Sequence, residues 1–250
     1  MSQVDVLGAI FRDFLFYGNV HATEVLEMIG GTGFNVYAGL QSIGIESFLH
    51  AAGGYDNPLQ EGVTIKQERT GIFVCRNEKE ALAVFRGANL MMQSEPMVSK
   101  VLFATLECGG EIFATYAMNM KRQGGMVILD PTPSFEWKRE WLEWCDVLLP
   151  NEKEFERLGK EVAMQKPVYL KHGIKGGSYL FQDQRYDVPI QEEGPFPLGC
   201  GDAFDVAVVY GLLHHLLPQE ILTMAVRAGE KASFVKGSSA AVMAALKAMF

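Results

Sequence analysis

The stretch Pro197–Phe204, with the sequence PLGCGDAF, decides the fold of this 250-residue chain. Gly199 and Gly201 flank one small residue, so the backbone can turn tightly there and bring its N–H groups close to a ligand. The apolar run Val206–Leu217 behind it predicts a buried helix that Pro218 would end. A glycine turn that opens a buried helix presents free N–H groups and the positive end of the helix dipole. This arrangement suits an anion such as a phosphate.

Asp202 lies in the first turn of the predicted helix. A carboxylate beside an anion site can accept the proton of a hydroxyl group that attacks a phosphate. An aspartate at a helix start can also be an ordinary cap, because its oxygen accepts free backbone N–H groups. These residues alone support both interpretations equally.

Composition restricts the classes of partner. The length fits one large domain with at most a small appendage. The formal net charge of −8 argues against nucleic acid as the main partner, because a phosphate backbone needs a basic surface. No uninterrupted apolar stretch reaches the ~18 residues of a membrane span. We therefore expect neither a nucleic-acid partner nor a membrane partner.

The cysteines and the N-terminus indicate a cytoplasmic protein. Charged residues interrupt the first apolar stretch at Asp5, Arg12 and Asp13, so it has no signal-peptide layout. The cysteines have no paired spacing, which fits reduced thiols better than disulfides or a zinc site. They are Cys75, Cys108, Cys145 and Cys200.

The first third of the chain contains a second glycine-rich stretch. Val4–Ile10 predicts a short first strand, and Asp13 would follow just past its end, where ligands of open α/β sheets gather. Gly30–Asn35, with the sequence GGTGFN, opens a helical pattern that Gly44 closes. Its glycines allow close backbone approach, and Asn35 offers both a donor and an acceptor. A ligand contact is expected at both places.

The rest of the chain predicts an α/β sheet with a strand appendage. Thr70–Cys75 and Ala81–Phe85 are strand-like, and the polar residues Asn77–Glu80 between them predict a hairpin. From about residue 100 onward, strands and helices alternate, with polar or glycine turns at the strand ends. That pattern is typical of a parallel sheet wound with helices.

Four stretches, taken in order, resemble the signatures of the ribokinase-like (PfkB) family of carbohydrate kinases. GGTGFN at 30–35 is similar to the N-terminal signature, and GCGDAF at 199–204 is similar to the C-terminal G-A-G-D signature. NEKE at 151–154 matches the N-x-x-E element, and HGIKG at 172–176 resembles the nucleotide-side glycine loop. The resemblance covers essentially the whole chain.

This resemblance implies a Rossmann-like three-layer α/β sandwich, a single domain whose small β-strand lid is formed from parts of 10–25 and 63–87. It implies an ATP-dependent phosphotransferase that moves the γ-phosphate to a hydroxyl of a small sugar. A nucleoside kinase is the alternative, and a non-catalytic sugar- or nucleotide-binding regulator of the same fold is another. Asp202 with both flanking glycines argues against the regulator. A dinucleotide-dependent oxidoreductase is disfavoured because no G-x-G-x-x-G follows the first strand.

The resemblance also implies roles for individual residues. Asp202 would be the catalytic base, and the N–H groups of Gly199, Cys200 and Gly201 would form the anion hole. Residues expected to bind the acceptor are Asp13, Gly31, Asn35 and Glu107. Residues expected at the ATP site are Asn151, Lys171, Gly173 and Gly176, with Glu154 at Mg²⁺.

Three departures from the family pattern change these expectations. Phe196–Leu198 stands where an Asp-Thr pair usually contributes to a monovalent-cation site, so a dependence on potassium is in doubt. Lys171 stands where the nucleotide loop has a threonine, and its cation could meet a phosphate instead. Asp56–Val63 is short for the family and suggests a trimmed helix near the lid.

The predicted lid has more apolar surface than one covered face requires. A small sheet with two apolar faces is unstable in water, so its second face should be buried. A twofold homodimer in which two lids pack together would bury it, and packing on the chain's own core is the alternative. The apolar positions are Ile72, Val74, Leu82, Val84 and Phe85.

Overall fold

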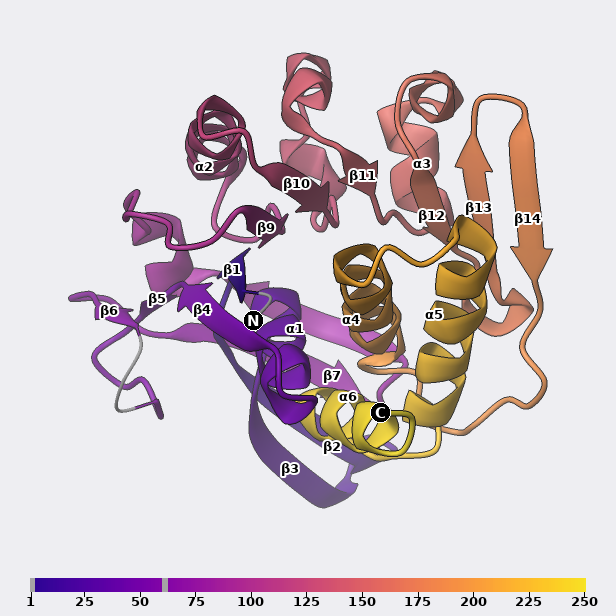
Figure 1. The fold of residues 1–250 in the computed structure, drawn as a ribbon. Coiled ribbons are helices and arrows are strands. Elements are labelled where there is room, and N and C mark those ends of the chain that lie inside the picture. The colour runs from indigo at the N-terminus through magenta and orange to yellow at the C-terminus, as the bar shows by residue number, and fades with distance from the viewer. Residues whose placement is uncertain (1–2, 60–62) are drawn as a thin grey trace.

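The computed structural model describes residues 3–59 and 63–250. Its main sheet has the strand order β14-β13-β12-β11-β10-β9-β1-β4 (Figure 1). The pairs from β4 to β12 are parallel, and β13 and β14 add an antiparallel hairpin at one edge. The strands are β1 Gln3–Leu7, β4 Glu46–His50, β9 Val101–Ala104, β10 Met126–Leu129, β11 Val147–Leu148, β12 Val168–Lys171, β13 Gly177–Phe181 and β14 Gln184–Val188.

Helices cover both faces of this sheet, which confirms the predicted three-layer sandwich. Successive strand residues point to opposite faces. Phe103 of β9 accordingly packs with α1, α4, α5 and α6, whereas its neighbour Leu102 packs with α2 and α3. The helices are α1 Thr32–Ser42, α2 Gly110–Arg122, α3 Glu152–Leu158, α4 Cys200–Leu213, α5 Pro218–Ala232 and α6 Ser238–Lys247. Short 3₁₀ turns are η1 Gly87–Met91, η2 Ser134–Glu136, η3 Arg139–Trp144, η4 Lys160–Met164 and η5 Gly173–Lys175.

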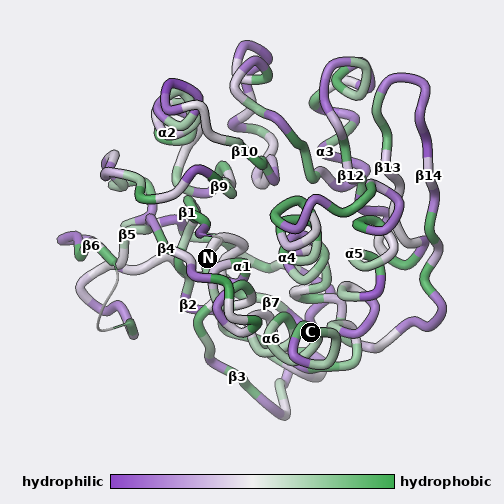
Figure 2. Tube along the Cα trace, viewed as in Figure 1, coloured by the Kyte–Doolittle hydropathy of each residue, from purple (hydrophilic) through white to green (hydrophobic). Residues whose placement is uncertain are grey.

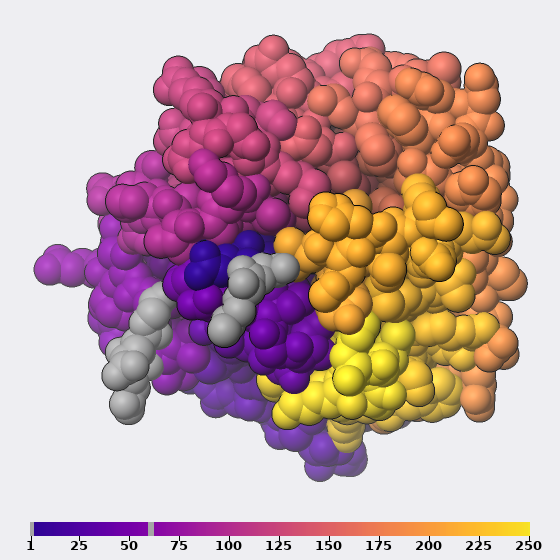
Figure 3. Space-filling model, in the orientation of Figure 1, coloured from indigo at the N-terminus to yellow at the C-terminus, as the bar shows by residue number. Residues whose placement is uncertain are grey.

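The three C-terminal helices, α4, α5 and α6, form one continuous part of the surface seen in Figure 3. Helix α4 lies between α1 and α5 and carries mainly hydrophobic residues (Figure 2). It is the buried helix that the apolar run predicted. Among the described residues, no helix combines the length and the hydropathy that crossing a bilayer requires.

A second, four-stranded sheet has the order β3-β2-β7-β8. The predicted hairpin is confirmed as β7 and β8, and its turn places Asn77 (φ 50°) and Glu78 (φ 56°) in the left-handed region. The strands are β2 Phe11–Gly18, β3 Ala22–Gly30, β7 Gly71–Arg76 and β8 Glu80–Phe85. The ranges given to a lid, 10–25 and 63–87, include β2, β7, β8 and part of β3. Strands β5 Ala52–Gly53 and β6 Thr64–Ile65 form a separate pair. The segment Asp56–Val63 includes residues 60–62, which lie outside the described residues.

The first strand is shorter than predicted. It ends at Leu7, and Asp13 lies inside β2 of the small sheet, not in the loop after β1. The reason is the buried side chain of Asn89, which forms hydrogen bonds with both the backbone N–H and the backbone carbonyl of Ile10. The Ile10 N–H donates to Asn89 Oδ1 at 3.0 Å, and Asn89 Nδ2 donates to Ile10 O at 2.9 Å. The chain therefore leaves the main sheet before residue 10.

The prediction that Pro218 ends the long helix is wrong. Helix α4 ends at Leu213, and the left-handed residue His215 (φ 54°) separates it from α5. Pro218 is the first residue of α5, where its missing N–H costs no hydrogen bond. The hairpin of β13 and β14 was not predicted. Its turn uses Gln182 (φ 53°) in the left-handed position, where glycine or asparagine is the usual signal.

Candidate active site

The glycine turn of residues 199–201 opens helix α4. Gly199 has φ 82°, and a Cβ there would lie 2.6 Å from the carbonyl oxygen of Ser238, so only glycine fits. Within the part of the chain that the structure describes, the N–H groups of Gly199 and Gly201 have no acceptor. The Cys200 N–H donates to Pro197 O at 3.4 Å. The helix start thus offers free donors for an anion.

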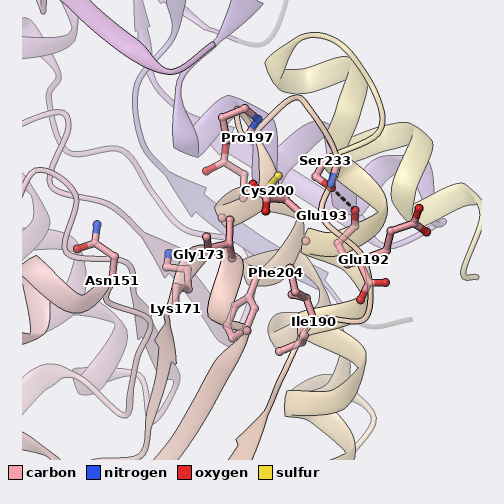
Figure 4. Close-up of a pocket in the computed structure, with 18 of the residues that line it drawn as sticks. Asn151, Lys171, Gly173, Ile190, Glu192, Glu193, Pro197, Cys200, Phe204 and Ser233 are labelled. Atoms are coloured by element: carbon pink, nitrogen blue, oxygen red, sulfur yellow. Dashed lines mark hydrogen bonds between the residues drawn. The ribbon is translucent and has the colours of Figure 1, made fainter. Parts of the chain in front are cut away.

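Two cavities meet at this helix start. Cavity 1, about 370 Å³, lies between the end of β12, η5, α4 and α5 (Figure 4). Cavity 2, about 410 Å³, lies between the small sheet and the ends of the main-sheet strands. Thr32, Thr132 and Asp202 line both cavities. Groups bound in the two cavities would therefore face each other across Asp202.

Asp202 is held by the N-terminal glycine-rich stretch. Asn35 Nδ2, on α1, donates to Asp202 Oδ2 at 2.6 Å. Burial raises the pKa of Asp202, while the bond from Asn35 and the charge of Lys171 act against that rise. A general base works best when its pKa lies near the operating pH, so an elevated carboxyl pKa suits proton acceptance.

Asp13 reaches cavity 2 from strand β2. Ser238 Oγ donates to Asp13 Oδ2 at 2.8 Å, whereas Asp13 Oδ1 is buried without a partner. The side-chain oxygen of Asn35, Oδ1, is also buried without a partner among the described residues. Burial raises the pKa of Asp13 to about 7, and the nearby carboxylates of Asp202 and Glu107 add to the rise. Gly31 (φ 98°) lies in the same cavity wall.

Glu107 lines cavity 2, but both of its oxygens are already occupied. The N–H of Thr32 donates to Oε1 at 3.0 Å, and Oε2 accepts from Gly33 N at 3.1 Å, Ala9 N at 3.1 Å and Thr105 Oγ1 at 3.0 Å. Burial raises the pKa of Glu107 to about 7 against the effect of these bonds. Glu107 therefore fixes the N-terminus of α1, and a direct acceptor contact would have to displace one of these donors.

Asn151 and Glu154 form a reciprocal cap at the start of α3. Glu154 N donates to Asn151 Oδ1 at 3.0 Å, and Asn151 N donates to Glu154 Oε2 at 2.8 Å. This geometry explains the N-x-x-E spacing. Thr132 Oγ1 donates to the remaining oxygen, Glu154 Oε1, at 2.7 Å. Asn151 lines cavity 1, and Glu154 is buried behind it.

Lys171, at the end of β12, belongs to a buried charge cluster. Its Nζ lies 2.8 Å from Asp130 Oδ2 and 3.0 Å from Asp205 Oδ1. Burial alone would lower the pKa of Lys171, but the two carboxylates outweigh it and raise that pKa. Nζ also lies 4.0 Å from the position that a Cβ on Gly201 would take. The ammonium is therefore next to the helix start, and any phosphate there shares it with two carboxylates.

Two glycines and several apolar side chains line one part of cavity 1, beside Glu192 and Glu193 (Figure 4). Gly173 and Gly176, both with positive φ, line it, and a Cβ on Gly176 would lie 2.0 Å from Val188 O. Apolar side chains from α4, α5 and the loop after β14 complete a slot that suits a flat ring. They are Ile190, Phe204 and Val226.

The sequence did not predict several residues of the site, some of which line the cavities. The sequence could have indicated Asp205, because it is an acidic residue inside an apolar helical run. Lys79 lies in the β7–β8 turn, which was read only as polar, yet it lines cavity 1. No local pattern could have indicated Ser238, since its partner Asp13 lies 225 residues away in the chain. Thr132 and Arg86 were not predicted either.

An α/β sandwich with a glycine turn, a free helix start and a carboxylate between two cavities has the features that a phosphotransferase requires. The chain belongs to the pfkB family of carbohydrate kinases, because the model of that family matches residues 1–244. No protein with a curated description matches it.

Solved structures of kinases share the fold. The chain is similar to a ribokinase from Thermotoga maritima, with 21% identity, 99% of each chain covered and a TM-score of 0.83. It is similar to an Arabidopsis thaliana ribokinase complexed with ribose and ATP, with 21% identity, 99% of each chain covered and a TM-score of 0.81. The chain is also similar to a Burkholderia thailandensis nucleoside kinase in complex with inosine, with 17% identity and a TM-score of 0.80. The match covers 100% of this chain and 99% of that kinase.

Proposed function

We propose that this protein transfers the γ-phosphate of ATP to a hydroxyl of a small sugar or a nucleoside. The observation that carries the proposal is the place of Asp202, which lines both cavities beside the free N–H groups of the α4 start. ATP would occupy cavity 1, with its ring in the slot beside Gly173 and Gly176. The acceptor would occupy cavity 2, beside Asp13 and Asn35. A similar ribokinase is complexed with ribose and ATP, and a similar nucleoside kinase is in complex with inosine, which supports these classes of ligand.

In the reaction that we propose, Asp202 accepts the proton of the acceptor hydroxyl. The hydroxyl oxygen forms a bond to the γ-phosphorus, and the bond from that phosphorus to the β–γ bridging oxygen breaks, which releases ADP. The N–H of Gly201 and the positive end of α4 stabilise the charge on the transferred phosphoryl group. The two cavities supply the positioning that this reaction depends on.

Mg²⁺ is the metal that a nucleotide kinase requires. Within residues 3–59 and 63–250, no group of three His, Cys, Asp or Glu side chains is placed to hold a metal ion. The carboxyl group of Glu154 lies behind Asn151, and its oxygens accept bonds from Thr132 and Asn151. Such a donor set fits Mg²⁺ held mainly by phosphates and water, as is usual for this ion. Glu154 and Asn151 would hold that hydrated ion, which neutralises phosphate charge when bound.

We propose that the small sheet is the lid of the acceptor cavity, because Asp13, Phe73 and Val84 from its inner face line cavity 2.

An ATP-dependent reaction and unpaired cysteines also agree with the cytoplasmic location expected from the sequence.

A coupled assay of ADP release tests the function. The protein is screened with ATP and Mg²⁺ against sugars and nucleosides, and Asp202→Asn serves as the blank. Phosphorylation of at least one hydroxyl compound, absent from the blank, is expected. ATP binding without phosphorylation of any compound would favour the regulator.

Asp13→Asn is expected to weaken acceptor binding about 5- to 150-fold, the equivalent of ~1–3 kcal/mol for a charged hydrogen bond. Hydroxyl donors favour the carboxylate form, and the pKa of Asp13 is about 7. Wild-type affinity for the acceptor should therefore rise with pH through that value, and the variant should lose this dependence. Titration calorimetry with ATP is the control, and loss of ATP binding instead would assign Asp13 to the wrong ligand.

The outer face of the lid predicts a homodimer. Strand pairing puts Phe14 beside Val74, and Ile72 beside Phe85, on the face opposite cavity 2. All four side chains are at least partly exposed, and a second copy would cover them. Light scattering should show a dimer that Val74→Glu converts toward monomer, whereas Val98→Glu, at an exposed valine outside the lid, should not. A monomeric wild type at micromolar concentration rejects the lid dimer. Val84 belongs to the apolar positions that the sequence assigned to the lid, but it does not suit this test because it faces cavity 2.

A further inference from the structure

Cavity 2 has a polar wall with two unused acceptor atoms. Asp13 Oδ1 and Asn35 Oδ1 are buried without a hydrogen-bond partner among the described residues, and both side chains line the cavity. A buried polar atom without a partner costs about 1–3 kcal/mol, so these positions favour a ligand that supplies donors. The amide oxygen of Asn35 only accepts, and so does the carboxylate form of Asp13. The end of the ligand that lies here should therefore carry at least two hydroxyl groups.

The charges of cavity 2 disfavour an acidic ligand. Among the described residues, three carboxyl groups line it, on Asp13, Glu107 and Asp202, against the cation of Arg86. Arg86 is already committed to protein acceptors. Its Nε donates to Glu107 O at 2.9 Å, its Nη2 to Leu106 O at 3.0 Å, and its Nη1 to Glu136 Oε1 at 2.6 Å. A carboxylate or phosphate on the ligand would meet repulsion here without a free cation to offset it.

Much of the remaining lining of cavity 2 is apolar, and part of it is uncovered. Phe135 is 64% exposed and Val84 is 57% exposed, although both line the cavity. The guanidinium of Arg86 lies over the ring of Phe135, 5.8 Å from its centroid, and helps to hold that ring in place. A free sugar carries a hydroxyl on nearly every carbon and has little apolar surface to offer such a wall. A flat ring would cover it and pack against the aromatic side chains. The remaining apolar lining residues are Phe11, Phe73, Pro133 and Leu198.

We propose that the acceptor is an uncharged polyol that carries a flat, apolar ring, as in a nucleoside or an aryl glycoside, and that Phe135, Phe73 and Val84 select for the ring. This inference rests on the proposed function, because it takes cavity 2 as the acceptor site. Asp13 and Asn35 hold the hydroxyl end, next to Asp202, and the ring lies beneath the lid.

Equilibrium binding without ATP tests the proposal independently of turnover. Titration calorimetry compares uridine with D-ribose, and phenyl β-D-glucoside with D-glucose, and includes D-gluconate as the acidic compound. At least one ring-bearing compound should bind about tenfold or more tightly than its parent sugar, and gluconate should not bind. The proposal is overturned if each parent sugar binds as tightly as its ring-bearing derivative, or if gluconate binds most tightly.

Variants of Phe135 test whether this residue causes the tighter binding of ring-bearing compounds. Phe135→Ala should bring the affinity ratio of ring-bearing compound to parent sugar toward one, with little change for the parent, and Phe135→Tyr should keep the ratio. Tyr55→Ala is the matched control, since Tyr55 is equally exposed, at 64%, but lies outside the cavities. An unchanged ratio in Phe135→Ala contradicts the assignment of the ring site. If D-ribose is phosphorylated as fast as uridine, the kinase function stands and this inference fails. If ring-bearing compounds bind but none is phosphorylated, the inference stands and the kinase function fails.

Discussion

Asp202→Asn is expected to lower turnover by about 10²–10⁴-fold, the usual contribution of a general base. The substitution keeps the size of the side chain, and the amide oxygen of the new residue can still accept the bond from Asn35. The fold and the affinity for ATP should therefore change little. The loss arises because an amide cannot take up the proton of the attacking hydroxyl. Steady-state turnover with the acceptor found in the screen measures the effect, and calorimetry with ATP checks the binding.

Asp183→Asn is the control for this experiment. It makes the same chemical change in the exposed turn between β13 and β14, outside both cavities. Its turnover should equal that of the wild type. If Asp202→Asn also retained turnover within a few-fold of wild type, Asp202 would not be the base, and its bond to Asn35 would be structural.

Lys171→Met is expected to lower the free energy of unfolding by about 3–5 kcal/mol, because removal of one partner leaves the other charges buried and unpaired. The side chains of Asp130 and Asp205 are almost completely buried, at 3% and 0% exposure, and Lys171 Nζ is their shared cation. Urea denaturation measures the loss. Asp205→Asn in the same chain should restore part of it, since one of the unpaired charges is then gone.

Lys175→Met provides the matched comparison. This lysine lies four residues away, is 72% exposed, and pairs with Glu152 at 3.5 Å on the surface. Its replacement should change the free energy of unfolding by no more than about 0.5 kcal/mol. Equal effects of the two methionine variants would show that the buried cluster contributes no more than a surface pair. They would contradict the role of Lys171 as the cation that Asp130 and Asp205 share.

Much of the fold could be predicted from local pattern. The apolar run behind Gly199–Asp202 indicated a buried helix, and the alternation after residue 100 indicated the parallel sheet. These patterns depend on residues close in the chain, so they are visible without the structure. Errors arose where a distant side chain competes for the backbone, as Asn89 does at Ile10, or where an unusual residue such as Gln182 makes a turn.

The sequence by itself determined the chemistry that is available: a glycine turn, an acid in the first turn of a helix, and a second glycine-rich stretch with an asparagine. Only the tertiary structure decided which of these groups meet. Asn35 touches Asp202 across 167 residues, and Ser238 touches Asp13 across 225. It also gave Glu107 four protein donors, enclosed Lys171 between two carboxylates, and turned Val84 toward the cavity. Such contacts depend on how strands and helices pack, and packing is set by side chains far apart in sequence. For that reason, local pattern identifies candidate residues, whereas their partners, burial and charge state follow only from the folded chain.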